Sequence, residues 1–298
     1  VVYRAYPTGT KAGDIIKDLA MLEDILINLS GVEDGDALLS PWEIQNEKAL
    51  EIMKSVARGT NYWLRIKPAL SYLSVNGEDG YITTPTEDLS FNEFTVIFWL
   101  RYKYTSSDQI GWRGIVDKGR NDIKDWWFLT QSHGWKIVFG VGNGSTYREL
   151  YFGDMSDGDW HMIAGQWRNS DRKHVAWFDL SKIEATRDID IVPSTRPIEI
   201  GRRSLGGDYS FIEIANLLYY NRFLSDSEIQ NIYNNPINPI TDGLVLWLNG
   251  HRFENNVVPD LSGNDNDGTA YGGVSQDYEV YPRHVNSMLL EFKPKVIA

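Results

Sequence analysis

From Tyr72 onward the apolar residues recur with a period of two, in short runs rich in Val, Ile, Phe, Tyr and Trp. This pattern is typical of β-strands. Gly- and Asn-rich turns separate the runs, and their residues readily adopt the positive φ that tight turns need. Many short strands joined in this way predict a mainly β protein, a two-sheet antiparallel sandwich of the jelly-roll type. The expected strands cover residues 94–100, 135–139, 160–164, 174–178, 198–200, 212–220 and 244–248.

One helix is expected among these strands, over residues 226–233. Ser225 precedes it as the N-cap, and Glu228 stands three residues later, where its side chain closes a capping box. Pro236 and Pro239 then favour an extended connection, because proline ends helices and restricts the residue before it.

The first 68 residues have a different period. Apolar residues spaced by four and three form one stripe of an expected α-helix, at Ile15, Leu19, Leu22, Leu26 and Leu29. A second helix is expected to begin at Ser40-Pro41-Trp42-Glu43, which has the pattern of a helix N-terminus, and to end at Gly59. Residues 1–68 are therefore predicted to contain an α-helical hairpin, which either packs on its own domain or mediates oligomerisation or docking.

Composition excludes several kinds of function. The 298 residues include no cysteine, which excludes disulfides, thiol catalysis and thiolate metal centres. The net charge of −12 disfavours a nucleic-acid partner, since phosphates need a basic surface. The longest fully apolar stretch, 96–100, is far too short to span a membrane. The first residue is Val and no basic-then-apolar leader follows, so we expect a signal peptide either to have been removed or never to have existed.

Four motifs between residues 73 and 229 follow one another in a recognisable order. They are Leu73–Ile82 with Phe94–Trp99, Gly158–Ala164, Pro197–Gly201 and Tyr220–Ile229. On these motifs the chain resembles the laminin-G-like, concanavalin A-like lectin family. The resemblance implies two antiparallel sheets, usually no catalysis, frequent structural calcium, and ligands held by loops or by the concave face. Ala215-Asn216 stands where the family commonly has an acidic pair, which argues against a metal site that uses that pair.

The segment 243–274 stands in an unusual place for that family. Its run Leu244–Leu248 and its loop Asp260–Gly268 resemble a segment that normally precedes the counterpart of Leu73, but here they come last. An unpaired apolar strand promotes aggregation, so this strand must join a sheet. It either folds back into its own sandwich, as a circular permutation, or completes a neighbouring subunit by strand exchange. The expected jelly roll thus covers 69–298, with 275–298 as a C-terminal extension.

Familiar signatures of catalysis are missing from the sequence. Glycosidases of this fold need two nearby carboxylates, and no Glu-x-Asp-x-Glu occurs. Gly-x-Ser-x-Gly, His-Glu-x-x-His and a Walker loop are missing as well. We therefore expect a protein that is not an enzyme.

Aromatic and polar residues gather between positions 112 and 135. Flat rings beside carboxylates, amides and guanidinium groups suit a sugar, which stacks through its C–H faces and hydrogen-bonds through its hydroxyls. The alternative is that these tryptophans only pack in the core. The candidate ligand-binding residues are Trp112, Arg113, Asp117, Arg120, Asn121, Trp126, Trp127 and Trp135.

The loop 260–268 is a candidate site for a structural calcium ion, because it concentrates the oxygen ligands that Ca²⁺ prefers. The alternative is an Asx-rich turn whose side chains bond the backbone. The candidate ligands are Asp260, Asn264, Asn266 and Asp267, with Asp79 from another loop to complete the shell.

These observations predict a non-catalytic, lectin-like protein that recognises a glycan or another surface ligand on a cell or virus particle. The alternative is a structural, self-assembling subunit of a virion coat, spike or extracellular fibre. Either function implies an extracellular, cell-surface or virion-surface location. The expected partners are a glycan or surface-protein ligand and further copies of the chain, joined through the N-terminal helices or by strand exchange.

Overall fold

The computed structural model describes residues 3–6, 27–32, 42–45, 62–85, 89–103, 111–130, 134–203, 207–236, 238–250, 253–279 and 287–294. The chain forms two compact units, one of residues 1–70 with 278–298 and one of residues 71–277. Within the described ranges, every helix is too short or too polar to cross a membrane.

Strands from both ends of the chain make up the first unit. β1 (Tyr3–Tyr6) pairs antiparallel with β3 (Trp42–Gln45). β2 (Ile27–Val32) pairs in parallel with β20 (Ser287–Pro294). β20 also pairs antiparallel with the first half of β4 (Tyr62–Asn76). Strand pairing therefore joins the N-terminal and C-terminal segments of this unit.

The expected N-terminal helical hairpin is wrong where the structure describes it. The end of the first expected helix lies in β2, and the start of the second forms β3. Trp42-Glu43-Ile44-Gln45 alternates apolar and polar residues, a pattern that suits a strand. Pairing with β1 outweighs the capping signal, which is only a local preference. The rest of both expected helices lies outside the described residues.

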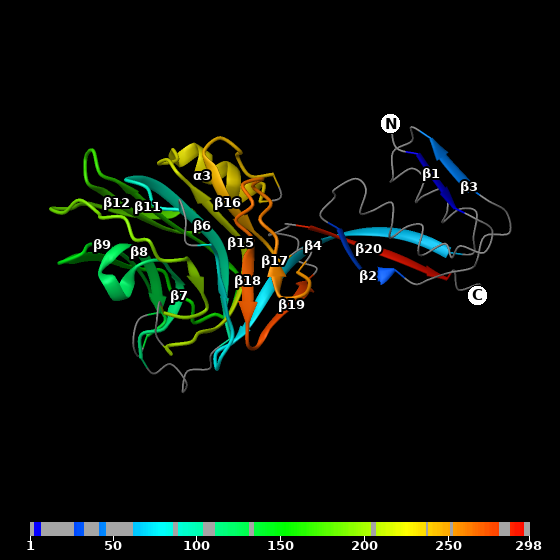
Figure 1. Cartoon of the computed structure of the whole chain (residues 1–298), viewed down its shortest axis with the longest axis horizontal. Helices are drawn as coiled ribbons and strands as arrows, with labels where there is room; N and C mark the ends of the chain where they lie inside the picture. The colour runs from blue at the N-terminus through cyan, green and yellow to red at the C-terminus, as the bar shows by residue number, and fades with distance from the viewer. Residues whose placement is uncertain are drawn as a thin grey trace. The chain divides into compact units, whose positions relative to one another are not determined.

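The second unit is a sandwich of two antiparallel sheets (Figure 1). In the first sheet the strands are hydrogen-bonded in the order β10-β9-β8-β7-β14-β5-β18-β17. Their bounds are β5 Tyr81–Thr83, β7 Gly114–Asp117, β8 Lys124–Thr130, β9 Ile137–Asn143, β10 Tyr147–Phe152, β14 Glu199–Ile200, β17 Val257–Val258 and β18 Gly268–Tyr271.

The second sheet has the order β13-β12-β11-β6-β15-β4, in which β4 contributes residues 71–76. β16 pairs with β15, and β19 pairs with β4. The bounds are β6 Glu93–Tyr102, β11 His161–Arg168, β12 Lys173–Phe178, β13 Ser181–Thr186, β15 Phe211–Tyr220, β16 Leu244–Leu248 and β19 Val274–Glu279.

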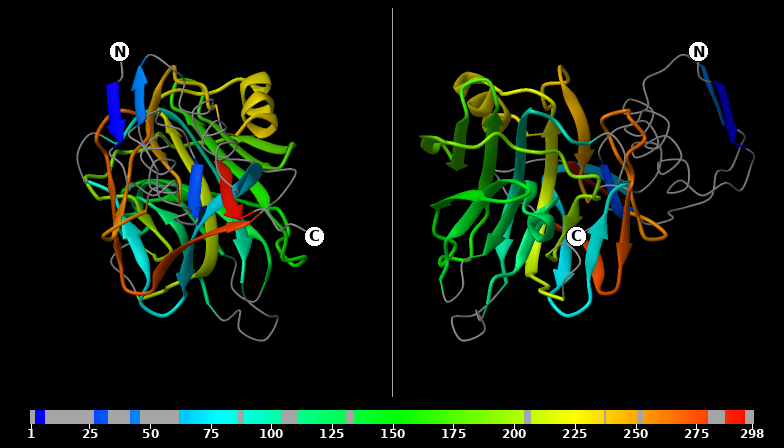
Figure 2. Two further views of the ribbon diagram at one scale, coloured as in Figure 1. Left: turned by 90° about the vertical axis from the view of Figure 1, so that its right-hand side faces the viewer. Right: turned by 60° about the vertical axis from the view of Figure 1, so that its left-hand side comes forward.

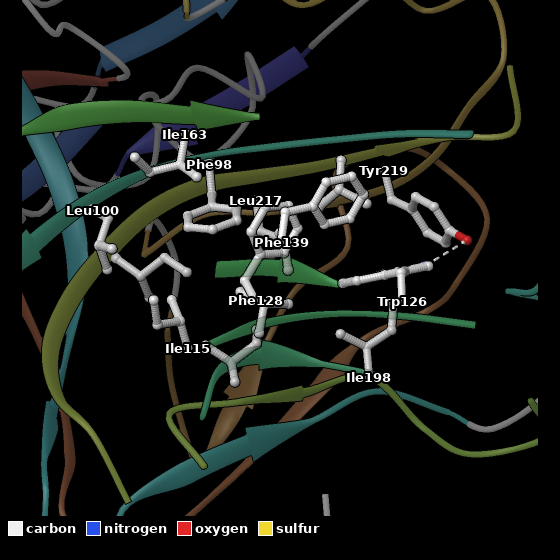
Figure 3. Close-up of a cluster of buried hydrophobic side chains, with 14 of the residues drawn as sticks. Phe98, Leu100, Ile115, Trp126, Phe128, Phe139, Ile163, Ile198, Leu217 and Tyr219 are labelled. Atoms are coloured by element: carbon white, nitrogen blue, oxygen red, sulfur yellow. Dashed lines mark hydrogen bonds between the residues drawn. The ribbon is translucent and has the colours of Figure 1, made fainter. Parts of the chain in front are cut away.

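Aromatic side chains from both sheets fill the space between them (Figure 3). Phe98 on β6 meets Phe128 on β8 edge to face, with ring centroids 5.0 Å apart, and Phe128 stacks on Phe139 at 4.7 Å. Trp126 belongs to the same core, where its indole nitrogen donates a hydrogen bond to the Tyr219 hydroxyl (3.1 Å). This core fixes one face of each sheet and leaves the opposite face of the first sheet available for other contacts.

The helix α3 (Asp226–Asn234) confirms the sequence prediction. Ser225 accepts a hydrogen bond from the backbone of Glu228, and the Glu228 side chain accepts one from the backbone of Ser225, so both halves of the capping box are present. α3 lies outside the strands in both views of Figure 2, where it is drawn in yellow.

The late segment 243–274 contributes to both sheets of its own sandwich. β16 pairs antiparallel with β15, with Leu248 opposite Leu217. β18 pairs antiparallel with β5, which places Ala270 opposite Ile82. In this chain the segment thus pairs within the molecule. Its origin as a circular permutation stays a prediction.

Candidate functional site

A continuous row of residues crosses the outer face of the first sheet. In successive strand pairs Glu199 lies opposite Asp117, Asp117 opposite Trp127, Trp127 opposite Gly140, and Gly140 opposite Glu149. Directly opposed residues in neighbouring antiparallel strands share one face of the sheet. The core-facing Trp126 shows that this face points away from the space between the sheets, because successive side chains alternate.

Gly140 makes room for the indole of Trp127. A Cβ at position 140 would lie 2.0 Å from Nε1 of Trp127, so only glycine allows the ring to lie across β9. The ring reaches the next strand, where Nε1 donates a hydrogen bond to Oε1 of Glu149 (3.3 Å). Trp127 is fully buried in this position.

The edge strand β10 places Tyr147, Glu149 and Tyr151 on the same outer face, because they alternate along it. The two tyrosines are 40% and 45% exposed, unusual for such large rings. The Tyr151 hydroxyl donates a hydrogen bond to Oε2 of Glu149 (3.0 Å). Burial and the neighbouring Glu149 carboxylate raise the pKa of Tyr151, so the hydroxyl keeps its proton.

The turn between β7 and β8 places Arg120 above this face. Oδ1 of the buried Asp117 accepts hydrogen bonds from the backbone N–H groups of Gly119 and Arg120, both at 2.9 Å, and so begins the 3₁₀ turn η1 (Arg120–Asp122). The guanidinium carbon of Arg120 lies 5.2 Å from the ring centroid of Trp127 and 4.8 Å from that of Tyr147. Such distances are within the range of cation–π attraction.

A pocket of about 170 Å³ lies at this edge of the sheet. Trp112, just before β7, meets Tyr151 edge to face with a centroid distance of 6.2 Å. The walls of the pocket combine aromatic rings, two guanidinium groups and one carboxylate. The lining residues are Trp112, Arg120, Leu129, Tyr147, Glu149, Tyr151 and Arg203. The pocket can therefore stack a flat apolar surface and also donate and accept hydrogen bonds.

The predicted ligand-binding residues separate into three groups. Trp112 and Arg120 line the pocket. Trp127 and Asp117 hold lining residues in place, since Trp127 donates a hydrogen bond to Glu149 and Asp117 accepts one from the backbone of Arg120. Arg113 donates to the backbone oxygen of Tyr209 (2.6 Å), and Asn121 is exposed outside the pocket lining. Trp126 belongs to the core, and Trp135 packs against it.

Sequence reasoning missed five of the lining residues, namely Tyr147, Glu149, Tyr151, Arg203 and Leu129. The first three lie on a strand that was not expected, since its apolar residues are few. A usable signal exists in Tyr147-Arg-Glu-Leu-Tyr151, where tyrosines flank a carboxylate at alternate positions. Leu150 and Phe152, at the intervening positions of the same strand, pack toward the core on the opposite face. Arg203 gives no such signal.

In the described structure the candidate calcium ligands of the loop 260–268 form hydrogen bonds within the protein, and a calcium ion at this loop stays a prediction. Both oxygens of Asp260 accept hydrogen bonds, Oδ1 from the backbone of Trp247 (2.8 Å) and Ser262 (2.9 Å), and Oδ2 from Ser262 Oγ (2.8 Å) and the backbone of Asn266 (3.1 Å). A cation would have to replace these donors. Asp267 Oδ1 likewise accepts from the backbone of Asp260 (2.7 Å).

The remaining candidate calcium ligands also have other roles. The side-chain amides of Asn264 and Asn266 both donate to the backbone oxygen of Val245, at 3.4 and 3.0 Å. Asp79 accepts hydrogen bonds from Asn76 (2.8 Å) and from the backbone of Gly273 (3.0 Å), which places it in a separate turn. Among the residues with described side chains, no group of three or more acidic or histidine ligands comes together. The contacts match the Asx-rich turn.

Solved structures resemble this fold at low sequence identity. A candidate carbohydrate-binding protein of Bacteroides ovatus has a TM-score of 0.55 and 11% identity, over 92% of this chain and 86% of that one. The binding domain of Paraclostridial Mosquitocidal Protein 1 (TM-score 0.47, 17% identity) is matched over 60% of this chain and 49% of its own. The botulinum neurotoxin serotype D binding domain (0.45, 12%) is matched over 59% and 47%. This chain thus spans about half the length of those two toxin domains.

No curated protein sequence gives a significant match. A family model does match, over residues 76–230, just over half of the chain. The chain belongs to the concanavalin A-like lectin/glucanases superfamily.

Proposed function

We propose that this protein is a non-catalytic lectin that binds carbohydrate in the pocket at the edge of the first sheet. The observation that carries the proposal is the partly exposed pair of tyrosines, Tyr147 and Tyr151, beside Trp112 and the polar groups of Glu149 and Arg120. Membership of the concanavalin A-like lectin/glucanases superfamily and the fold shared with a candidate carbohydrate-binding protein support carbohydrate binding.

The pocket has the chemistry that a sugar needs. Aromatic rings provide faces for the sugar's C–H groups, and the guanidinium groups donate to its hydroxyls. Each oxygen of Glu149 accepts one hydrogen bond within the fold and has a second lone pair for a sugar hydroxyl. Its volume of about 170 Å³ is smaller than the roughly 300–1,000 Å³ of pockets that enclose drug-sized ligands. The pocket therefore suits one sugar residue of a longer glycan.

The same residues argue against hydrolysis. Glycosidases place two carboxyl groups about 5–10 Å apart, one on each side of the bond that breaks. Of the described residues that line the pocket, Glu149 is the one carboxylate, and Trp127 and Tyr151 already hold its two oxygens. We expect incubation with β-glucans and galactans to release no reducing ends.

A location outside the cytoplasm, on a cell or virus-particle surface, is part of this proposal and follows from the ligand class. Self-assembly into a coat, spike or fibre is the alternative from the sequence. Of the N-terminal segments through which copies were expected to assemble, the described parts are strands, and the rest lies outside the described residues.

Two exposed tyrosines offer a matched test. Tyr151 is 45% exposed inside the pocket, and Tyr271 is 46% exposed on β18, outside the pocket lining. We expect Tyr151→Ala and Trp112→Ala to weaken binding to glycans selected on an array by about tenfold or more, measured by titration calorimetry. Tyr271→Ala should bind like the unmodified protein. If the unmodified protein binds no glycan, the proposal is contradicted. It is also contradicted if all three variants bind as tightly as the unmodified protein.

A further inference from the structure

Three charged side chains line the pocket, and the one carboxylate among them already accepts two hydrogen bonds from other side chains of the protein. Glu149 accepts a hydrogen bond on each oxygen, from the indole of Trp127 (3.3 Å) and the hydroxyl of Tyr151 (3.0 Å). The two remaining charged groups are the guanidiniums of Arg120 and Arg203. The charge that the pocket offers to a ligand is therefore mainly positive.

Arg120 forms no ion pair with any described residue. Its guanidinium is positioned instead by the rings of Trp127 and Tyr147, at 5.2 and 4.8 Å from their centroids. Its Nε is buried, and no described group accepts its hydrogen bond. Buried donors in native proteins nearly always have a partner, which is a protein group, an ordered water or a ligand, so this guanidinium can still donate to an acceptor from outside the chain.

Arg203 repeats the pattern on another wall of the pocket. Its Nη1 pairs with the exposed Asp208 (3.1 Å), but its Nε is buried with no acceptor among the described residues. The planar guanidinium of an arginine is a fork of paired N–H donors that matches the two oxygens of a carboxylate or sulfate. Two such forks in one aromatic pocket favour an anionic ligand.

We propose that the pocket selects an acidic sugar residue, bearing a carboxylate or a sulfate ester, whose anionic group binds Arg120 and Arg203 while its ring stacks on the aromatic wall. This inference rests on the proposed carbohydrate-binding function. The net charge of −12 repels polyanions from the chain as a whole. Binding of an acidic sugar must therefore arise locally, at these two arginines.

The test compares acidic sugars with matched neutral ones on one array. The pairs are galacturonate with galactose, glucuronate with glucose, and 6-sulfated with unsulfated galactose, with inorganic sulfate as a separate competitor. We expect the unmodified protein to prefer the acidic member of at least one pair by about tenfold, the size of a charge-assisted hydrogen-bonded contact. The carboxylate and sulfate pairs show which anionic group is preferred.

Arginine variants then test which residues cause the preference for the acidic sugar. Arg120→Gln and Arg203→Gln should each lower it to about twofold or less, and Arg120→Lys should keep part of it, since charge remains without the fork. Arg172→Gln is the matched control, because Arg172 is exposed and pairs with Asp190 outside the pocket. Thermal midpoints confirm that each variant is folded.

Each other outcome overturns a stated part of the inference. Equal binding of acidic and neutral sugars leaves the lectin function standing and refutes the acidic preference. A preference that both arginine variants retain places the anion elsewhere and refutes this site. Displacement by inorganic sulfate at the affinity of the sugar itself shows a general anion site. Failure to bind any sugar refutes the proposed function together with this inference.

Discussion

The indole nitrogen of Trp127 donates a hydrogen bond to Oε1 of Glu149, 3.3 Å away, although the two residues lie on strands separated by β9. Gly140 is the residue of β9 between them. The missing side chain at position 140 lets an aromatic ring bridge two strands. That ring then supports both the carboxylate and the guanidinium of the pocket.

Replacing Gly140 with alanine should therefore disturb stability and binding together. The added Cβ would lie 2.0 Å from Nε1 of Trp127 and must displace the ring. We expect Gly140→Ala to lower the free energy of unfolding by about 1–3 kcal/mol, as overpacking usually does, and to weaken glycan binding. Urea unfolding and calorimetry measure the two effects. Gly207→Ala is the control, since a Cβ there meets nothing within 4 Å. Unchanged stability of Gly140→Ala would show that the ring moves freely.

Seven strands of the second unit could be predicted because alternation and turn residues are local signals, namely β6, β9, β11, β12, β14, β15 and β16. The strands that build the pocket, β7, β8 and β10, were not expected. Local signals do not show on which face of the sheet an aromatic side chain lies. Trp126 and Trp127 are neighbours in one run, yet one belongs to the core and the other supports the pocket. Strand register decides this, and it depends on residues of the neighbouring strand, such as Gly140 on β9.

Helical spacing gave a wrong prediction at residues 27–32, where the end of the first expected helix lies in β2. Some apolar residues spaced by three and four also stand at alternate positions, as a strand requires. Residues 27–32 form a strand, which pairs with β20 at the other end of the chain. No local pattern reveals a partner about 260 residues away. The tyrosines of β10 were missed for a different reason, since an exposed edge strand needs few apolar residues.

Asp125 gives a pH dependence that can be measured. Its Oδ2 accepts hydrogen bonds from Ser90 (2.7 Å) and from the backbone of Ser194 (3.1 Å), but its Oδ1 is buried without a described partner. Burial raises the pKa of Asp125 to about 6, although the nearby Lys118 opposes the rise. A carboxyl whose pKa is raised by folding stabilises the protein at low pH and loses that contribution as pH rises through the folded pKa.

We therefore expect Asp125→Asn to stabilise the protein at about pH 8, by about 1–3 kcal/mol, and to have little effect at about pH 3, below the ordinary pKa of an aspartate. Asparagine keeps an acceptor for Ser90 and Ser194, and it tolerates the positive φ of 55° at this position. Thermal midpoints of both proteins across this range provide the measurement. A difference between them that stays constant with pH would show that Asp125 does not titrate there.

Chelation tests the turn at 260–268. The hydrogen bonds accepted by Asp260 stabilise the turn without a cation, so we expect EDTA to leave the thermal midpoint unchanged. Asp260→Ala should lower the free energy of unfolding by about 1–3 kcal/mol, because buried or partly buried donors lose their acceptor. If calcium is found by elemental analysis and its removal lowers the midpoint, the loop rearranges to bind the ion.

The pairing of β16 with β15 can be tested without shortening the chain. Leu246 is fully buried in the core, whereas Val257 on β17 is 39% exposed. If residues 243–274 complete the sandwich of their own chain, Leu246→Ala should cost about 2–5 kcal/mol, and Val257→Ala about 0.5 kcal/mol or less. The unfolding midpoint of the unmodified protein should not depend on its concentration, because folding then joins no second chain. A midpoint that rises with concentration would indicate strand exchange between copies. An unperturbed Leu246→Ala variant would mean that the segment is not part of the fold's core.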